Sequence, residues 1–207
     1  DGAIEALWIA APTPAVGWRV EKGVDNVIPS PLIHDGILYS VRNGGILTAF
    51  DAKTGKEIWK VKLAEWKEGY SITSAPTVAN GVLMQGIAGG EFGIRGFVDG
   101  YDPDTGKRLY RRHTTPDPGE KGSETWPKGD QWKNGGGSIW GPGNYDPETN
   151  LAYWGVGNGG PWDRVARSAG QGDNLYLSSI VAVRRRTGEY VWHFQEVPGD
   201  EWDYTAT

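Results

Sequence analysis

An eleven-residue pattern recurs in this chain and constrains its fold more than any other feature of the sequence. Residues 49–59 read AFDAKTGKEIW; residues 100–110 keep the Asp, the Thr-Gly pair and a terminal aromatic residue; residues 182–192 keep the Ala, the Thr-Gly pair and the Trp. Each copy predicts a hairpin whose turn Gly takes positive φ and whose second strand carries an aromatic residue four positions later. Hairpins repeated every few tens of residues predict stacked sheets, as in a β-propeller.

The composition agrees with a turn-rich β protein and narrows its partners. The 32 Gly and 13 Pro of the 207 residues lie in turns and at strand ends, without a collagen-like period. A net charge of −5 without a basic stripe argues against nucleic acid, and no apolar run approaches the ~18 residues of a membrane span. With no Cys there is no disulfide or thiolate metal site. Because the chain starts with neither Met nor a signal peptide, we expect it to begin within a longer precursor.

The repeats predict three to four blades of four antiparallel strands, within one domain spanning residues 1–207. Trp18, Trp59 and Trp192 close a repeat or stand where one would close, so we expect them to pack between blades. We expect further strands on both sides of Asp35-Gly36, within 75–84, and at 138–140 and 151–156. Because a propeller typically needs at least four blades, the predicted propeller is incomplete, with its remaining blades supplied by further sequence or by another chain.

The spacing between the second and third repeats is longer than that between the first and second. The excess includes residues 113–134, a polar stretch rich in Pro, Gly and Lys without hydrophobic periodicity. Long loops on a compact scaffold are usually functional or disordered. The carboxylates of Glu120, Glu124 and Asp130 in this loop are expected to be solvated.

Four segments contain residues that a structural repeat does not need. Residues 86–96 surround one carboxylate with glycines, residues 135–140 place glycines before an indole, residues 155–162 end a strand at an Asn, and residues 199–204 contain three carboxylates. Each segment alone is explained better by an ordinary turn. Together they supply an oxygen-only ligand set suited to a hard cation such as calcium: Glu91, Asn158 and Asp203.

At these segments the chain resembles the PQQ (pyrroloquinoline quinone) dependent alcohol dehydrogenases of the methanol/ethanol type, and most closely the quinohaemoprotein alcohol dehydrogenases. The motifs that carry the resemblance are GGEFGIRG at 89–96, GNGGPW at 157–162, GDNLYLS at 172–178 and PGDEWDYT at 198–205. The resemblance implies an eight-bladed propeller with the quinone above a Trp and a divalent cation beside it. It also implies an alcohol substrate, a cytochrome c-type or quinone electron acceptor, and a periplasmic location.

The same resemblance assigns roles to individual residues. Trp140 would form the floor of the quinone site, and Thr73 with the backbone of residues 88–90 (Ala88, Gly89 and Gly90) would bind the polar edge of the quinone. Glu91 and Asn158 would bind the cation. Asp203 would be the general base, also close to the cation, with Asp200 and Glu201 as solvated neighbours. Lanthanide-dependent members carry a second Asp two positions after the base, and this chain has Thr205 there, so we expect Ca²⁺.

The sequence departs from the family pattern at two points. Residues 24–31 contain no adjacent cysteine pair, and the Arg partner that accompanies that pair in the family is not evident.

A non-catalytic propeller scaffold acting through protein contacts would share the Trp repeats, but it would not need the three oxygen ligands together. A PQQ enzyme acting on polyols or sugars is the other alternative. His34, His113 and His193 have no ligand spacing and are expected to be structural or surface residues.

Overall fold

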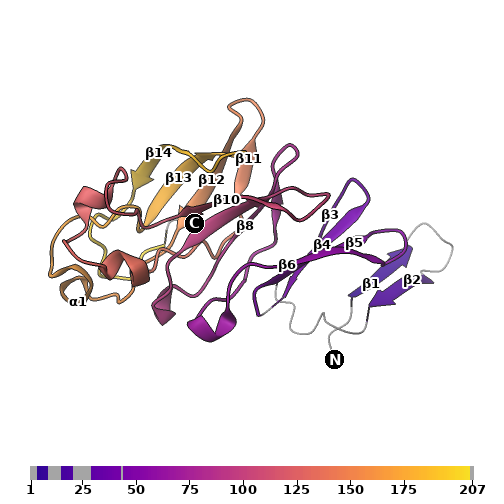
Figure 1. Ribbon diagram of the computed structural model, residues 1–207, viewed down its shortest axis with the longest axis horizontal. Helices are drawn as coiled ribbons and strands as arrows, with labels where there is room; N and C mark the ends of the chain where they lie inside the picture. Colours follow the sequence, from indigo (N-terminus) through magenta and orange to yellow (C-terminus); the bar gives the residue numbers. More distant parts are fainter. Residues whose placement is uncertain (1–3, 9–14, 21–28, 43, 206–207) are drawn as a thin grey trace.

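The computed structural model describes residues 4–8, 15–20, 29–42 and 44–205, and this part of the chain is almost entirely β (Figure 1). It forms three four-stranded antiparallel sheets side by side and one separate two-stranded pair. Among the described residues the single α-helix is α1, a short segment from Arg164 to Ser168. The predicted all-β fold with three to four blades and little helix is therefore confirmed.

Within each sheet the strands follow one another in sequence order, as in a propeller blade. The separate pair is β1 (Ile4–Trp8) and β2 (Ala15–Val20). The first sheet contains β3 (Leu32–His34), β4 (Ile37–Arg42), β5 (Ile46–Asp51) and β6 (Glu57–Lys62). The second contains β7 (Thr77–Val78), β8 (Leu83–Gly86), β9 (Phe97–Tyr101) and β10 (Arg108–His113). The third contains β11 (Asn144–Asp146), β12 (Leu151–Val156), β13 (Ser179–Arg184) and β14 (Tyr190–Gln195).

Two-residue turns join the first two strands of the first and second sheets. Asp35 and Gly36 have φ values of 47° and 77°, and Asn80 and Gly81 have φ values of 41° and 80°. Turns with positive φ at both central residues match the twist of the strands in a hairpin. Asp, Asn and Gly adopt positive φ more readily than other residues, which explains the Asp-Gly and Asn-Gly sequences. The strand expected at 138–140 is wrong: this segment is not part of a sheet, and β11 begins after it.

The repeat aromatic residues connect neighbouring sheets. Trp18 Nε1 donates to the Ala52 carbonyl at 2.9 Å, and Trp59 Nε1 donates to the Pro103 carbonyl at 2.9 Å. Each indole lies on the turn Gly of the next repeat, where a Cβ on Gly55 or Gly106 would come within 2.7 Å of the ring. These glycines are therefore needed both for their positive φ and for the close approach of the ring.

Trp192, the aromatic residue that ends the third repeat, is more exposed than expected. Trp59 is 8% exposed, whereas Trp192 is 44% exposed. The prediction that Trp192 is buried between blades is wrong for this structure, because no further repeat turn lies against it among the described residues. Its described ring contact is with Tyr153 of its own sheet, with the ring centroids 5.7 Å apart.

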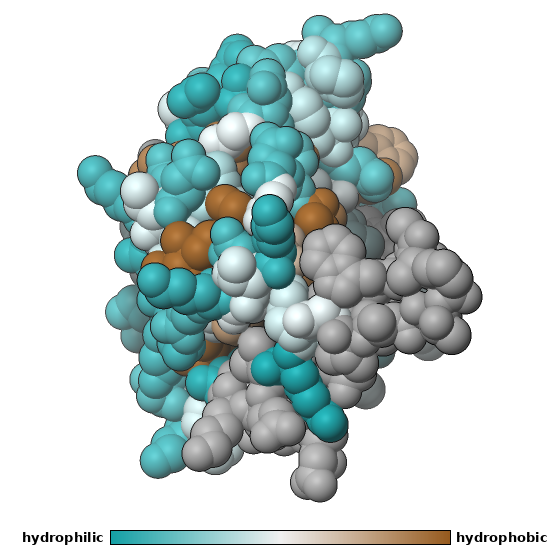
Figure 2. Space-filling model, turned by 90° about the vertical axis from the view of Figure 1, so that its right-hand side faces the viewer, coloured by the Kyte–Doolittle hydropathy of each residue, from teal (hydrophilic) through white to brown (hydrophobic). Residues whose placement is uncertain are grey.

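The hydrophobic core lies between adjacent sheets. One cluster joins the first and second sheets through residues such as Leu47, Leu83 and Phe97, and a second joins the second and third through Val98, Trp154 and others. Figure 2 views the end of the molecule near β1 and β2, where the described surface is mainly hydrophilic with small hydrophobic groups near its middle. None of the helices in the described part of the chain is long and apolar enough to cross a membrane.

The long segment after β10 is ordered and lies on the surface. It contains two 3₁₀ turns, η3 (Ser123–Thr125) and η4 (Gln131–Asn134), and Trp126 between them is buried. As expected, the carboxylates of Glu120, Glu124 and Asp130 are exposed. Glu120 pairs with Arg112 at 3.1 Å and Asp130 with Lys133 at 3.6 Å.

Candidate functional site

Backbone hydrogen bonds outside the sheets bring three of the glycine-rich segments side by side. Ile139 N donates to the Ile87 carbonyl, Gly157 N to the Ser138 carbonyl, and Gly137 N to the Asn158 carbonyl, each at 2.8 Å. Glycine permits this packing of backbone on backbone: a Cβ on Gly86 would lie 2.4 Å from the Ile139 carbonyl oxygen. Segments 86–91, 135–140 and 155–162 therefore form one connected surface, as the sequence hypothesis requires.

Asn158 presents an amide oxygen on this surface. The residue is 2% exposed, and its Nδ2 donates to the Gly159 carbonyl at 3.1 Å. Its Oδ1 accepts no hydrogen bond from any other described residue. A Cβ on Gly90 would lie 3.4 Å from this oxygen, so the amide sits beside η2 (Gly90–Phe92), the 3₁₀ turn that contains Glu91. A pocket of about 370 Å³ lined by Glu91, Gly160, Pro161 and Trp162 opens at the same place.

Asp203 lies close enough to Glu91 for their charges to interact. Partial burial raises the pKa of Asp203, and the charges of Glu91 and then Asp200 raise it further. Asp203 also has a φ of 62°, so the turn holds its backbone in the left-handed region. Two carboxylates whose charges interact, with an amide oxygen beside the turn of one of them, are ligand types that suit a hard cation, and the charge of such a cation would stabilise both carboxylates. The described residues contain no metal-binding cluster of three or more His, Cys, Asp or Glu, and the candidate set has two carboxylates with an amide as the third ligand.

The residues proposed for the quinone border the same surface. Thr73 Oγ1 donates to the Trp140 carbonyl at 2.8 Å, and a Cβ on Gly157 would lie 3.5 Å from Cδ1 of the partly exposed Trp140 ring. Ala88 exchanges backbone hydrogen bonds with Ser71 at 2.9 and 3.0 Å. This pairing places the backbone of residues 88–90 next to the strand-like segment that carries Thr73. An exposed indole face beside glycine backbone suits a flat, polar-edged ligand.

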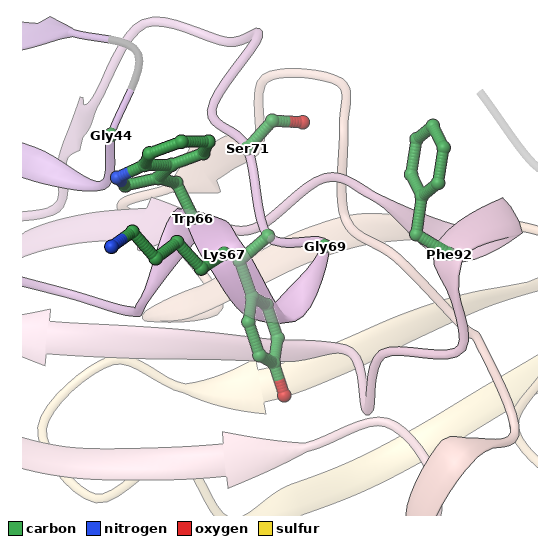
Figure 3. A pocket seen from close by; sticks show the side chains of 7 residues that line it. Gly44, Trp66, Lys67, Gly69, Ser71 and Phe92 are labelled. Atoms are coloured by element: carbon green, nitrogen blue, oxygen red, sulfur yellow. The ribbon is translucent and has the colours of Figure 1, made fainter.

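A second hollow lies beside the glycine loop. Its volume is about 580 Å³, and Figure 3 shows Trp66 and Phe92 on opposite sides of it with Ser71 between them. Gly69 lines this hollow, and a Cβ on Gly89 would meet its carbonyl. None of the predicted site residues lines it.

Sequence reasoning missed the residues that support the site. Asp200, expected to be solvated, is 3% exposed, because its carboxylate accepts hydrogen bonds from the backbone N–H groups of Trp202 and Tyr204. An Asp at the start of a tight turn is the signal that could have found it. Glu201 is exposed, as expected. The buried Arg167, whose Nη2 donates to the Asp200 carbonyl, had no such signal.

The three histidines lie in three different sheets and do not form a site. His34 is at the surface, 3.2 Å from Asp35. His113 packs edge-on against Phe97, and burial lowers its pKa to about 4. His193 packs edge-on against Tyr176, and burial lowers its pKa as well.

The three four-stranded sheets, with repeat Trp residues that dock on the turns of the next sheet, define a β-propeller domain. The family profile of the PQQ-type glucose/ethanol/alcohol dehydrogenase β-propeller domain matches residues 62–207. This chain belongs to that family.

Relatives of known function are similar over most of the chain. It is 51% identical over 174 residues to the quinohemoprotein alcohol dehydrogenase ADH IIB of Pseudomonas putida, an alignment that covers 79% of this chain and 25% of that protein. The solved structure of the quinohemoprotein alcohol dehydrogenase ADHIIG of the same species is 44% identical, covers 93% of this chain and 31% of its own, and superimposes with a TM-score of 0.86. A europium-containing methanol dehydrogenase is 33% identical, covers 98% and 39% respectively, and has a TM-score of 0.89. The chain thus spans about a quarter of the length of ADH IIB.

Proposed function

We propose that this chain forms the cofactor- and cation-binding part of a PQQ- and calcium-dependent alcohol dehydrogenase. In this role it contributes to oxidising an alcohol by hydride transfer to the quinone, and the electrons pass to a cytochrome c-type or quinone acceptor in the periplasm. The observation that carries the proposal is the position of Asn158 Oδ1 beside the turn that contains Glu91, with Asp203 near enough for its charge to interact with that of Glu91. The remaining blades would come from further sequence or another chain.

Each residue has a separate task in this proposal. Glu91 and Asn158 Oδ1 would bind the cation, Asp203 would lie next to it, and Trp140 would cover one face of the quinone. When bound, the quinone would supply a carbonyl able to accept hydride, and the cation would supply Lewis-acid polarisation of that carbonyl. Asp203 accepts the hydroxyl proton of the alcohol, and its exposed position on the turn leaves its carboxylate accessible to substrate. The backbone of Gly89 and Gly90 offers N–H donors to the carboxylates of the cofactor, whereas the N–H of Ala88 already donates to the Ser71 carbonyl.

Calcium is the cation we propose. Two carboxylates and one amide suit a divalent ion, and Thr205, two positions after Asp203, adds no third carboxylate for a trivalent one. Calcium also tolerates the irregular geometry of a site built from loops better than Mg²⁺ does. Polyols and sugars stay open as substrates. The 51% identity to a dehydrogenase favours an enzyme over a non-catalytic scaffold.

Reconstitution tests the proposal. Apo-protein with a complete propeller is incubated with PQQ and either Ca²⁺ or La³⁺, and alcohol oxidation is measured with the visible spectrum of the bound quinone. We expect Ca²⁺ to restore activity and Glu91→Gln to reduce it severely. Glu124→Gln, at an exposed carboxylate of the long surface segment, should have no effect. Activity restored by La³⁺ alone would refute the choice of calcium, and absence of quinone binding would refute the function.

A further inference from the structure

One buried guanidinium connects two of the three segments that present the candidate cation ligands, those of Asn158 and Asp203. Arg167 is 1% exposed, and its Nη1 donates to the carbonyls of Pro161 at 2.7 Å and Trp162 at 2.9 Å. Its Nη2 donates to the Asp200 carbonyl at 2.6 Å, and its Nε donates to Asn174 Oδ1 at 3.1 Å. A single side chain therefore ties the loop after β12 to the last described turn of the chain.

Arg167 also supports the peptide that orients the Asn158 amide. A Cβ on Gly159 would lie 2.5 Å from Arg167 Nη1, so the guanidinium packs directly against this glycine. The Gly159 carbonyl accepts the hydrogen bond from Asn158 Nδ2. Because that bond fixes which way the amide faces, the position of Gly159 decides where Asn158 Oδ1 points.

Asp200 plays the corresponding part for Asp203. Its Oδ1 accepts from Trp202 N at 2.8 Å and its Oδ2 from Tyr204 N at 3.0 Å, so its carboxylate binds the N–H groups of the residues on both sides of Asp203. Ser178 Oγ lies 3.0 Å from Asp200 Oδ2 and 2.9 Å from the Tyr204 carbonyl oxygen. A hydrogen bond from the Ser178 hydroxyl to either oxygen stabilises the turn. The left-handed backbone of Asp203 is thus imposed by a buried side chain.

Burying these charged groups carries a desolvation penalty that a propeller blade does not require. The hydrogen bonds of the Arg167 guanidinium go to uncharged oxygens, namely three backbone carbonyls and the Asn174 amide, so the side chain fixes the positions of the loops that carry them. Buried ionic groups of this kind contribute little net stability. Groups that orient first-coordination ligands, by contrast, tune metal affinity without touching the metal.

We propose that Arg167 and Asp200 are positioning residues that set the affinity of the cation site. Together they hold Asn158 Oδ1 and the Asp203 carboxylate at the separation a cation needs, although neither is a ligand. The inference rests on the proposed function and deepens it: the binding strength of the cation is fixed by a buried support that links the two loops.

Calcium titration calorimetry on the intact protein without quinone tests this inference. We expect Arg167→Met and Asp200→Asn each to weaken Ca²⁺ binding by about 10- to 100-fold. Arg111→Met is the matched variant. Arg111 is a guanidinium that is partly rather than fully buried, with Nε and Nη2 donating to the Asp99 carboxylate at 2.8 and 2.7 Å within the second sheet. It should lower stability and leave the calcium affinity unchanged.

Two milder variants keep the test decisive if the first ones fold poorly. Arg167→Lys should not restore binding, because one ammonium cannot reach all the acceptors of the guanidinium fork. Ser178→Ala should weaken Ca²⁺ binding in the same direction. Unchanged calcium affinity in the folded variants overturns the inference. A loss of calcium affinity in Arg111→Met equal to that in Arg167→Met also overturns it. Either result leaves the proposed function standing. Absence of Ca²⁺ binding by the wild-type protein overturns the proposed function, and the inference with it.

Discussion

Asp203 and Glu201 are both exposed carboxylates, two residues apart on one turn, yet we expect opposite consequences from removing their charges. The charge of Asp203 interacts with that of Glu91, and Asp203 is the proposed base, whereas Glu201 has no proposed role in the site. Losing a positioned general base typically lowers the rate about 10² to 10⁴-fold. Asp203→Asn should show that loss in kcat with PQQ and Ca²⁺ saturating, and Glu201→Gln should keep wild-type turnover. Full turnover in Asp203→Asn would remove Asp203 from the mechanism.

His113 makes the stability of the protein pH-dependent. Burial lowers its pKa from 6.5 to about 4, so the unfolded chain binds a proton at a pH where the folded protein does not. Its contribution is therefore fully present above pH 6.5 and is lost as the pH falls from there toward 4. Between pH 7.5 and pH 5 the loss should be roughly 2 kcal/mol.

Urea unfolding at these two pH values measures this contribution. His113→Gln should unfold with a smaller difference between pH 7.5 and 5 than the wild type, by about that amount. His34→Gln, at a surface position, should leave the difference unchanged. An identical pH dependence in wild type and His113→Gln would contradict the assignment.

At the scale of one structural element, the contact between a repeat Trp and the next turn can be tested through the turn glycine. Gly106 and Gly81 both have positive φ, of 70° and 80°, but a Cβ on Gly106 would meet Trp59 at 2.7 Å whereas one on Gly81 would meet nothing within 4 Å. Gly81→Ala should cost about 1–2 kcal/mol for the backbone alone. Gly106→Ala should cost a further 1–3 kcal/mol or so, because the indole must move. Equal losses in denaturant unfolding would mean that the ring contact contributes nothing.

The same local physics explains which elements the sequence predicts. The repeat hairpins and the Asp-Gly and Asn-Gly turns depend on residues that are neighbours along the chain, and they form as expected. The segment at 138–140 looks like a strand but instead contacts Ile87, because the glycines around it allow the backbones to approach. The hydrogen bond from Arg167 to the Asp200 carbonyl joins residues 33 positions apart, and no local pattern announces that partner. The candidate ligands themselves were found through their residue types and the resemblance.

At the scale of the whole molecule, the aromatic residues dock in one direction along the row of sheets. Trp18 lies on a turn of the first sheet, Trp59 on a turn of the second, and Tyr110 on Gly188 in a turn of the third. Trp192 occupies the equivalent place in the third sheet and is half exposed. We propose that a further blade packs there in a protein of the length of its relatives, so that the Trp192 ring lies on the turn of that blade.

Paired Trp substitutions decide whether that blade exists. In a protein limited to residues 1–207, Trp59→Ala should lower the free energy of unfolding by about 3–5 kcal/mol, because it removes a buried ring and its hydrogen bond. Trp192→Ala should cost much less in the same protein, since its ring already contacts solvent. In the longer protein the additional blade would bury the ring, and the two losses should become comparable. A Trp192→Ala loss that stays small there would show that no blade docks on this face, and the quinone would then need another cover for the open side of the propeller.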